Sequence, residues 1–256
     1  MDFASLIGIV SGIALIFISL VMGGGSIRSF INYPGVMIVF GGTAAATLLT
    51  FKMKEVTAAV KAAWFVFMVE QQDPNDTVAT MTRLSDVARK HGLLAVNEIQ
   101  TRSPFLKRMC NLLADGAEEA LLQRTMRIEI QALKARHSQV QEVFKRMGTY
   151  APAFGMLGTI IGLIKMLATL DDPSSVGPSM SVALVTTFYG SLLASLVFLP
   201  TAAKLKTRTT TEVINLEIIY EGVSSIHNGD DTYLIYEKLS SYIPTRTRRA
   251  LKRAKV

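Results

Sequence analysis

The chain has 256 residues, of which half are hydrophobic and 18% are charged, and its formal net charge is +7. The charged residues are grouped, because the ranges 3–27, 29–51, 147–164 and 173–203 contain no Asp, Glu, Lys or Arg. This pattern lacks the basic face interleaved with aromatic residues that nucleic-acid binding requires. The single cysteine, Cys110, leaves no internal disulfide and no cysteine-based metal site.

The uncharged ranges predict four transmembrane helices, over 3–22, 30–51, 148–170 and 179–203. Each is close to the roughly 20 residues that cross the hydrocarbon core of a bilayer. The first has too long an apolar run for a cleaved signal peptide. The only charge inside a predicted span is Lys165, which lies near one end, where a long side chain can reach the interface.

The distribution of basic residues predicts the orientation of these spans. Of the 27 Lys and Arg residues, fifteen lie between Lys52 and Arg146 and ten follow residue 203. Basic loops stay in the cytoplasm. The sequence therefore predicts an all-α membrane protein with four segments: transmembrane helices 1 and 2 (1–51), a helical cytoplasmic domain (52–147), transmembrane helices 3 and 4 (148–203) and a helical cytoplasmic tail (204–256).

The cytoplasmic segments show helix signals and no strand alternation. A helix is expected from about Thr77 to His91, with Gly92 placed to end it. Ser103-Pro104 is a good N-cap pair for a short helix that stops at Asp115-Gly116. From Glu118 the helical pattern continues into the third span.

The tail is expected to continue the fourth span as a helix to about His227, where HNGD turns the chain. A final amphipathic helix is expected to carry the basic end, Arg246 to Lys255. The histidines His91, His137 and His227 have no partner at catalytic or metal-ligand spacing, and no glycine-rich phosphate loop is present. The sequence therefore predicts no catalytic residues, no metal site, no cofactor and no enzymatic activity.

Small residues form a stripe along the third span. Glycine costs a soluble helix about 1 kcal/mol and proline about 3 kcal/mol per residue, yet small residues on one face let transmembrane backbones approach closely. The stripe consists of Gly148, Ala151, Gly155, Gly158 and Gly162. The fourth span carries Ala183, Thr187, Ser191 and Ser195 at spacing four. We expect Gly155, Gly158 and Gly162 to pack the subunit against copies of itself.

Three hydroxyls in the spans, on Thr159, Thr186 and Thr187, have two interpretations. Each can bond the carbonyl one helical turn back, or they can line an ion pathway. Proteins that move ions usually carry an acidic group within the membrane, and the four spans contain none. If this chain moves ions, the acidic group must come from another protein.

Five segments carry a resemblance to a known family, and together they extend over essentially the whole chain. They are MDFASLIGIVSGIA at the start, DVARKHGLLAVNE (86–98), APAFGMLGTIIGLIKML (151–167), DDPSSVGPSMSVALVTTFYGSLLASLVFLP (171–200) and EIIYEGVSSIHNG (217–229). The sequence resembles the MotA/PomA family of flagellar motor stator subunits, and its sodium-type PomA branch most closely.

The resemblance implies partners and a function. Subunits of this family form a homo-oligomer, a pentamer around two copies of a MotB/PomB-type partner whose transmembrane aspartate binds the ion. The complex lies in the bacterial inner membrane and turns ion flow into torque on a FliG-type rotor protein, which drives motility and chemotaxis. Two alternatives stay open: a proton-driven stator, and an ExbB/TolQ-type energiser of an envelope process.

The resemblance also assigns roles to residues of the spans. Pro152 and Pro178 match the two family prolines near the ends of the third and fourth spans, and a proline that frees a carbonyl suits a gate or hinge. Thr159 and Thr186 match positions associated with sodium use, and the first is commonly alanine in proton-driven relatives. These matches imply that the transported ion is Na⁺, with H⁺ as the alternative.

The rotor-contact motif of the family maps onto the cytoplasmic segment. Arg89 and Lys90 match its basic pair, and Glu98 matches an acidic member. Asn97 and Gln100 stand where PomA-like sequences carry carboxylates, so the acidic half is thinner here. From the residues alone, a solvated helix C-terminus favoured by the helix dipole is the preferred explanation of Arg89 and Lys90, and the resemblance favours rotor contact instead.

Overall fold

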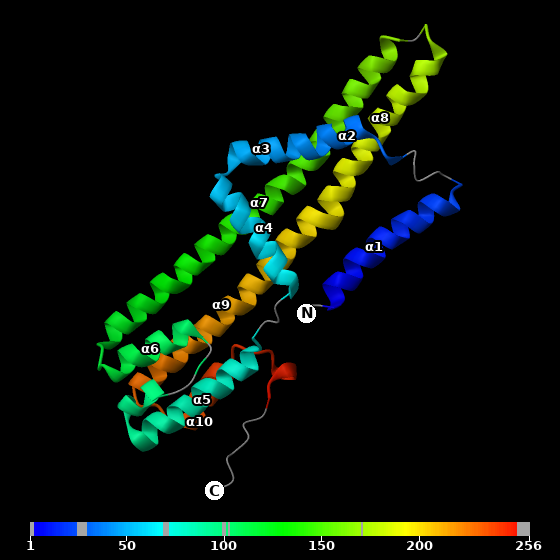
Figure 1. The fold of residues 1–256 in the computed structure, drawn as a ribbon. Coiled ribbons are helices and arrows are strands. Elements are labelled where there is room, and N and C mark those ends of the chain that lie inside the picture. Colours follow the sequence, from blue (N-terminus) through cyan, green and yellow to red (C-terminus); the bar gives the residue numbers. More distant parts are fainter. Residues whose placement is uncertain are drawn as a thin grey trace. The chain divides into compact units, whose positions relative to one another are not determined.

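The computed structural model describes residues 3–24, 30–68, 72–98, 101, 103–169 and 171–249. Within these ranges the chain forms α-, 3₁₀- and π-helices joined by turns, and no β-strand (Figure 1). The all-α prediction is therefore confirmed. The chain divides into two compact units, Met1–Glu70 with His137–Thr207 (unit 1) and Gln71–Arg136 with Arg208–Val256 (unit 2).

Unit 1 contains the predicted spans. Its helices are α1 (Phe3–Met22), α2 (Tyr33–Val36), η2 (Met37–Gly41), α3 (Gly42–Thr50), α4 (Met53–Met68), the second part of α7 (Glu119–Leu167), α8 (Pro173–Leu192), η4 (Leu193–Phe198) and the start of α9 (Leu199–His227). The segments α2–η2–α3 follow one another without a break, as do α8–η4–α9. The four predicted spans correspond to α1, to α2–α3, to the C-terminal part of α7, and to α8 through the start of α9.

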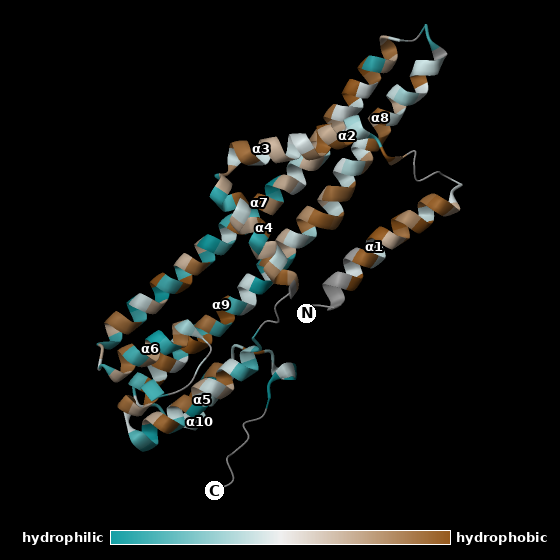
Figure 2. Cartoon of the chain, viewed as in Figure 1, coloured by the Kyte–Doolittle hydropathy of each residue, from teal (hydrophilic) through white to brown (hydrophobic). Residues whose placement is uncertain are grey.

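Length and hydropathy support this assignment. Three helical stretches among the described residues are long and apolar enough to cross a membrane, Tyr33–Thr50, Glu119–Leu167 and Ser174–His227. In α1 the stretch Val10–Met22 is a shorter apolar helix, and the whole of α1 is uncharged. Figure 2 shows hydrophobic residues along most of α1 and frequent hydrophilic ones on α5 and α6.

The fourth span begins earlier than predicted, at Pro173 instead of residue 179. The Asp172 carboxylate accepts a hydrogen bond from the Ser174 backbone N–H at 3.0 Å, which caps the helix. Pro178 therefore lies inside α8, as Pro152 lies inside α7. A proline inside a helix removes the hydrogen bond to the carbonyl four residues earlier, so Ser174 and Gly148 lose their helical donors.

Close contact between α7 and α8 organises unit 1. A Cβ atom added to Gly190 would lie 2.5 Å from the Ala151 carbonyl oxygen, and one added to Gly155 would lie 2.9 Å from the Thr186 carbonyl oxygen. At Gly162 the added atom would lie 2.7 Å from the Ala183 backbone nitrogen. The glycines thus let the two backbones touch, as small residues do in membrane helix pairs.

This contact gives the glycine stripe a partner within the same chain. Gly155 and Gly162 approach the α8 backbone, and Gly158 approaches the Thr186 side chain, where an added Cβ would lie 2.6 Å from it. The stripe therefore packs α7 against α8 of one subunit. Its predicted contact with other copies of the subunit stays a prediction.

Two π-helical segments interrupt the spans, η2 in the second and η4 in the fourth. Such segments are rare and often occur at functional sites. The η4 segment packs against α1, and a Cβ added to Gly12 would lie 3.1 Å from Leu196 Cδ2. The η2 segment contacts α8.

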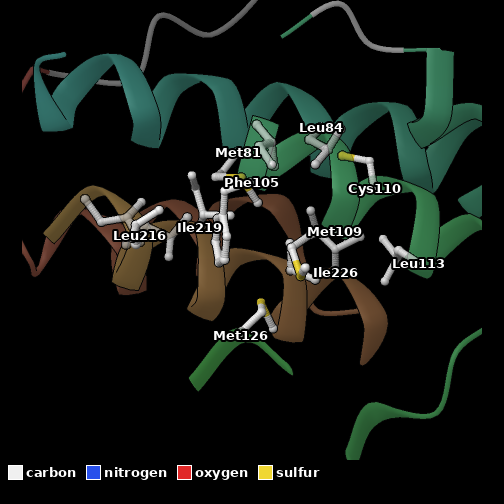
Figure 3. Close-up of a cluster of buried hydrophobic side chains, with 14 of the residues drawn as sticks. Met81, Leu84, Phe105, Met109, Cys110, Leu113, Met126, Leu216, Ile219 and Ile226 are labelled. Atoms are coloured by element: carbon white, nitrogen blue, oxygen red, sulfur yellow. The ribbon is translucent and has the colours of Figure 1, made fainter. Parts of the chain in front are cut away.

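Unit 2 combines the middle segment and the tail around one apolar core. Its helices are α5 (Pro74–His91), η3 (Leu93–Glu98), α6 (Pro104–Ala114), the first part of α7, the second part of α9, α10 (Thr232–Ser240) and η5 (Thr245–Thr247). Figure 3 shows the core side chains from α5, α6, α7 and α9 pointing toward one another. The fully buried members include Met81, Leu84, Met109, Leu113, Leu122, Met126, Ile218 and Leu239.

The helix ends of unit 2 follow the sequence signals. The Ser103 hydroxyl accepts a hydrogen bond from the Leu106 backbone N–H at 3.3 Å and caps α6. Gly92, with φ of 84°, ends α5 in a conformation that favours glycine. Asp73 caps α5 by accepting from the Asn75 N–H at 2.9 Å, so this helix begins at Pro74, slightly before the predicted Thr77.

The predicted helix over the basic end is not present in 246–249, and the rest of it, 250–255, lies outside the described residues. The last α-helix, α10, ends at Ser240, before the basic residues. Pro244 has no N–H to donate and restricts the residue before it to extended conformations. Arg246 lies in the short 3₁₀ turn η5, and residues 250–256 lie outside the described part of the chain.

The α7–α8 contact predicts unequal effects of two glycine substitutions in α8. Gly190→Ala places a methyl group 2.5 Å from a backbone oxygen, so the helices must separate, at a cost of roughly 1–3 kcal/mol. Gly177→Ala meets no heavy atom within 4 Å and should leave stability unchanged or slightly raised. The measurement is the thermal unfolding midpoint of the detergent-solubilised protein, and equal midpoints for the two variants would contradict the packing described.

Candidate functional site

The hydroxyls of Thr159 in α7 and Thr187 in α8 form a cluster with two backbone carbonyls. Thr159 Oγ1 lies 2.5 Å from Thr187 Oγ1, 3.2 Å from the Gly155 carbonyl oxygen and 3.1 Å from the Ala183 carbonyl oxygen. Thr187 Oγ1 lies 3.5 Å from the same Gly155 oxygen. Four oxygens from two helices thus share two hydroxyl protons.

The close backbones explain why this cluster forms. With any larger residue at 155, α7 and α8 could not approach closely enough for Thr159 to reach a carbonyl of the other helix. Thr159 is half-buried and Thr187 is exposed on the surface of the described chain. The oxygen cluster therefore lies at the surface of the α7–α8 pair.

Thr186 lies in a different environment from its neighbour. It is fully buried, and its hydroxyl lies 2.9 Å from both the Val182 and the Ala183 carbonyl oxygens of its own helix. Its methyl group packs against Gly35, where an added Cβ would lie 3.2 Å away. Of the three predicted pathway threonines, the structure thus brings Thr159 and Thr187 together and places Thr186 in the packing between α8 and its neighbours.

The backbone interpretation applies unequally to these hydroxyls. Thr159 and Thr186 both reach the carbonyl four residues back, as that interpretation predicts. Of these two, only Thr159 also reaches oxygens of another helix. A bond to its own helix therefore does not account for all the contacts of Thr159.

Tyr189 joins the second span to the fourth, a contact that the sequence reasoning missed. Its hydroxyl accepts a hydrogen bond from the Asn32 backbone N–H at 3.2 Å and donates one to the Phe30 carbonyl. Asn32 in turn caps α2 through its side-chain oxygen, 2.9 Å from the Gly35 nitrogen. A tyrosine in an apolar helix whose hydroxyl needs a partner is the available signal for such a contact.

The two prolines flank the oxygen cluster along their helices. A Cβ added to Gly190 would lie 3.1 Å from Pro152 Cα, so Pro152 lies where α8 crosses α7. Pro178 is exposed on α8. Their predicted role as a gate or hinge stays a prediction.

The predicted rotor-contact residues lie in unit 2 and differ in their contacts. Arg89, in the last turn of α5, makes an ion pair with Asp231, the N-cap residue of α10. Lys90 and Glu98 are exposed and make no ion pair with any described residue. The Asn97 carbonyl accepts from Lys107 Nζ at 2.7 Å, and Gln100 lies outside the described residues.

The pKa shifts in unit 2 have local causes. The bond from the Tyr233 backbone N–H, and then the Arg89 guanidinium, lower the pKa of Asp231. A bond to Glu221 raises the pKa of Lys238, against the effect of burial. Burial raises the pKa of the Cys110 thiol to about 11. Among the described residues, no group of three or more His, Cys, Asp or Glu side chains could hold a metal ion.

Unit 1 is thus a bundle of membrane-spanning helices that presents polar oxygens and no acid in its spans. Residues 97–218 match the MotA/TolQ/ExbB proton channel family. The chemotaxis protein PomA of Vibrio alginolyticus is 37% identical over 95% of this chain and 96% of its own length. Motility protein A of Cereibacter sphaeroides is 36% identical, over 93% of this chain and 94% of its own.

Solved structures agree with these sequence matches. The structure of MotAB from C. jejuni superimposes with a TM-score of 0.91 at 26% identity and covers 98% of this chain and 100% of its own. The flagellar MotAB stator complex from Bacillus subtilis gives a TM-score of 0.89 at 30% identity, over 96% and 97% of the two chains.

The chain therefore belongs to the MotA/TolQ/ExbB family and, within it, to the MotA/PomA stator subunits. Membership of this channel family confirms that the chain is not an enzyme. The apolar helices and the family together indicate a protein of the inner membrane.

The geometry of the oxygen cluster predicts a reactivity order for introduced thiols. Thr187→Cys and Thr159→Cys should react with a water-soluble methanethiosulfonate faster than the buried Thr186→Cys. The wild-type chain suits this test because Cys110 is its single cysteine and is buried. The pKa of the Cys110 thiol is about 11, so only about one part in ten thousand is the reactive thiolate at pH 7. Equal reaction rates for the cysteines at 186 and 187 would contradict the burial of Thr186 and the exposure of Thr187.

Proposed function

We propose that this chain is the ion-pathway subunit of a sodium-driven flagellar stator, which couples inward Na⁺ flow to torque on a rotor. The cluster formed by Thr159 Oγ1, Thr187 Oγ1 and the Gly155 and Ala183 carbonyl oxygens carries the ion assignment. Sodium is a hard cation and must be offered several oxygens in place of its water. A proton needs only an acid and a chain of hydrogen bonds.

The partner is a MotB/PomB-type subunit that supplies the carboxylate. No Asp or Glu occurs in 147–164 or 173–203, which contain the cluster, whereas ion-moving membrane proteins usually carry an acid within the membrane. The two solved relatives are MotAB complexes. In the proposed assembly five copies of this chain surround two copies of the partner, and the oxygen cluster lines the path to the partner's aspartate.

Exposed apolar side chains on the two helices suit such an assembly. On α7 and α8 they are Met156, Leu157, Ile160, Ile161, Leu163, Ile164, Leu167, Met180 and Leu184. In the assembly these residues face lipid, the partner or another copy. The asymmetry of Lys and Arg supports a cytoplasmic unit 2. In the proposed assembly its residues Arg89, Lys90 and Glu98 contact a FliG-type rotor protein.

The identities of the relatives do not discriminate between ions, since 37% for PomA and 36% for motility protein A are nearly equal. The proposal of sodium rests on the threonine oxygens instead. A proton-driven stator is the alternative outcome of the test that follows. An envelope energiser of the ExbB/TolQ type is not favoured by any contact in this structure.

Sodium coupling predicts that swimming depends on Na⁺. Thr159→Ala removes one oxygen ligand and should therefore weaken Na⁺ binding. Loss of one oxygen contact, about 0.5–1.5 kcal/mol, should raise the Na⁺ concentration for half-maximal swimming speed roughly two- to tenfold. The control is Thr149→Ala in the same helix, because among the described residues the Thr149 hydroxyl bonds only the Lys145 carbonyl, at 3.1 Å. Undiminished wild-type swimming in sodium-free potassium buffer at fixed pH would instead establish the proton-driven alternative.

The missing carboxylate predicts that this chain conducts no ions when it is expressed without its partner. Intracellular Na⁺ and pH should stay at control values in cells that make the chain alone. Intracellular Na⁺ or pH should shift when a partner with a transmembrane aspartate is co-expressed. Conduction by the lone chain would show that the pathway needs no acid from a second subunit.

A further inference from the structure

The Arg89 side chain is already occupied in the free subunit. Its Nη1 atom donates to Asp231 Oδ2, and both side chains are about half exposed, at 55% and 49%. The other oxygen of Asp231, Oδ1, accepts from the Tyr233 backbone N–H at 2.9 Å and caps α10. The Asp231 carboxylate therefore pairs with Arg89 through one oxygen and caps α10 through the other.

A second contact between α5 and α10 holds Arg89 and Asp231 in this arrangement. Ser85 lies one turn before Arg89 on α5, and its hydroxyl lies 3.1 Å from that of Thr232, the first residue of α10. The start of α10 is thus docked along the C-terminal half of α5. Beside it is a groove of about 850 Å³, lined among others by Lys90, Asp231, Thr232 and Tyr233.

The two basic residues at the end of α5 therefore differ in their ion-pair partners. Arg89 and Lys90 both lie in the last turn, where the helix dipole favours cations. Arg89 has a carboxylate partner, whereas Lys90 makes no ion pair with any residue in the described ranges. A carboxylate on a rotor protein could approach Lys90 directly, but at Arg89 it meets Asp231 first.

We propose that Asp231 is a positioning residue that holds Arg89 and competes with a carboxylate of the rotor for its guanidinium. This inference rests on the proposed rotor contact of the stator. Engagement is then an exchange of one carboxylate for another. The Asp231 pair keeps Arg89 extended from α5 toward α10 while the subunit is away from the motor.

The energetics suit a reversible exchange. An exposed ion pair contributes little to stability, so the rotor can displace Asp231 at small cost. Because the pair is exposed on both sides, water solvates the released carboxylate without a burial penalty. Removing the competing charge should therefore lengthen the residence of the stator on the motor by about two- to fivefold, the range that an exposed pair supports.

Two substitutions remove the charge and keep the helix cap. Asn and Ser cap helix N-termini about as well as Asp, so Asp231→Asn and Asp231→Ser retain the bond from the Tyr233 N–H. The matched control is Asp230→Asn, because Asp230 has the same charge one position earlier and makes no ion pair with Arg89. Immunoblots of the membrane fraction verify equal amounts of each variant.

The experiment measures the residence time of tagged stator units on single motors, in cells that make the full chain with its partner and lack other stators. Asp231→Asn and Asp231→Ser should lengthen residence, Asp230→Asn should not, and Arg89→Gln should shorten it. In the Arg89→Gln background, Asp231→Asn should have no further effect, since its action requires the guanidinium. A structural role of Asp231 would not produce this dependence on Arg89.

Three results would overturn the inference, and they are distinguishable. If Arg89→Gln shortens residence but the Asp231 variants match wild type, the rotor contact holds and the competition does not exist. If Asp231→Asn acts equally with and without Arg89, Asp231 acts by another route. If Arg89→Gln leaves residence unchanged, the rotor contact of Arg89 fails, and the inference fails with it.

Discussion

The backbone contact between α7 and α8 is the constraint on which unit 1 depends. Gly155, Gly162 and Gly190 remove the side chains that would hold the two helices apart, as the added Cβ distances of 2.5–2.9 Å show. Only at this separation can the Thr159 hydroxyl reach the Ala183 carbonyl on the other helix. The loss of helix propensity at each glycine is offset by packing, which is the main attraction between helices in lipid.

That contact also explains how a span without acids can present polar atoms. Threonine hydroxyls can bond a carbonyl of their own helix, so they enter an apolar segment at little cost. At the α7–α8 surface the hydroxyls and carbonyls of two helices converge, and their oxygens become available together. Tyr189 ties the start of α2 to the same helix pair, so three predicted spans meet around it.

Much of the fold followed from local signals in the sequence. Uncharged stretches located the spans, Ser103 and Gly92 located helix ends, and the continuous helix from Glu118 into the third span is present as α7. The exception was the start of the basic end, where an amphipathic helix was expected and residues 245–247, after Pro244, form a 3₁₀ turn instead. The sequence also did not identify the helix that packs against the glycine stripe, because a face of small residues can pack against any helix that comes close.

The sequence by itself determined the membrane-spanning helices, the absence of an acid within them and the family. These properties depend on composition and on residues near one another along the chain. The tertiary structure decided which hydroxyls gather and which charges pair. Thr186 and Thr187 are adjacent in sequence, but their side chains point about 100° apart around the helix axis. Thr186 is therefore buried, whereas Thr187 contacts Thr159. Arg89 meets Asp231 only because α10 folds back on α5, a contact between residues 142 positions apart that no local pattern encodes.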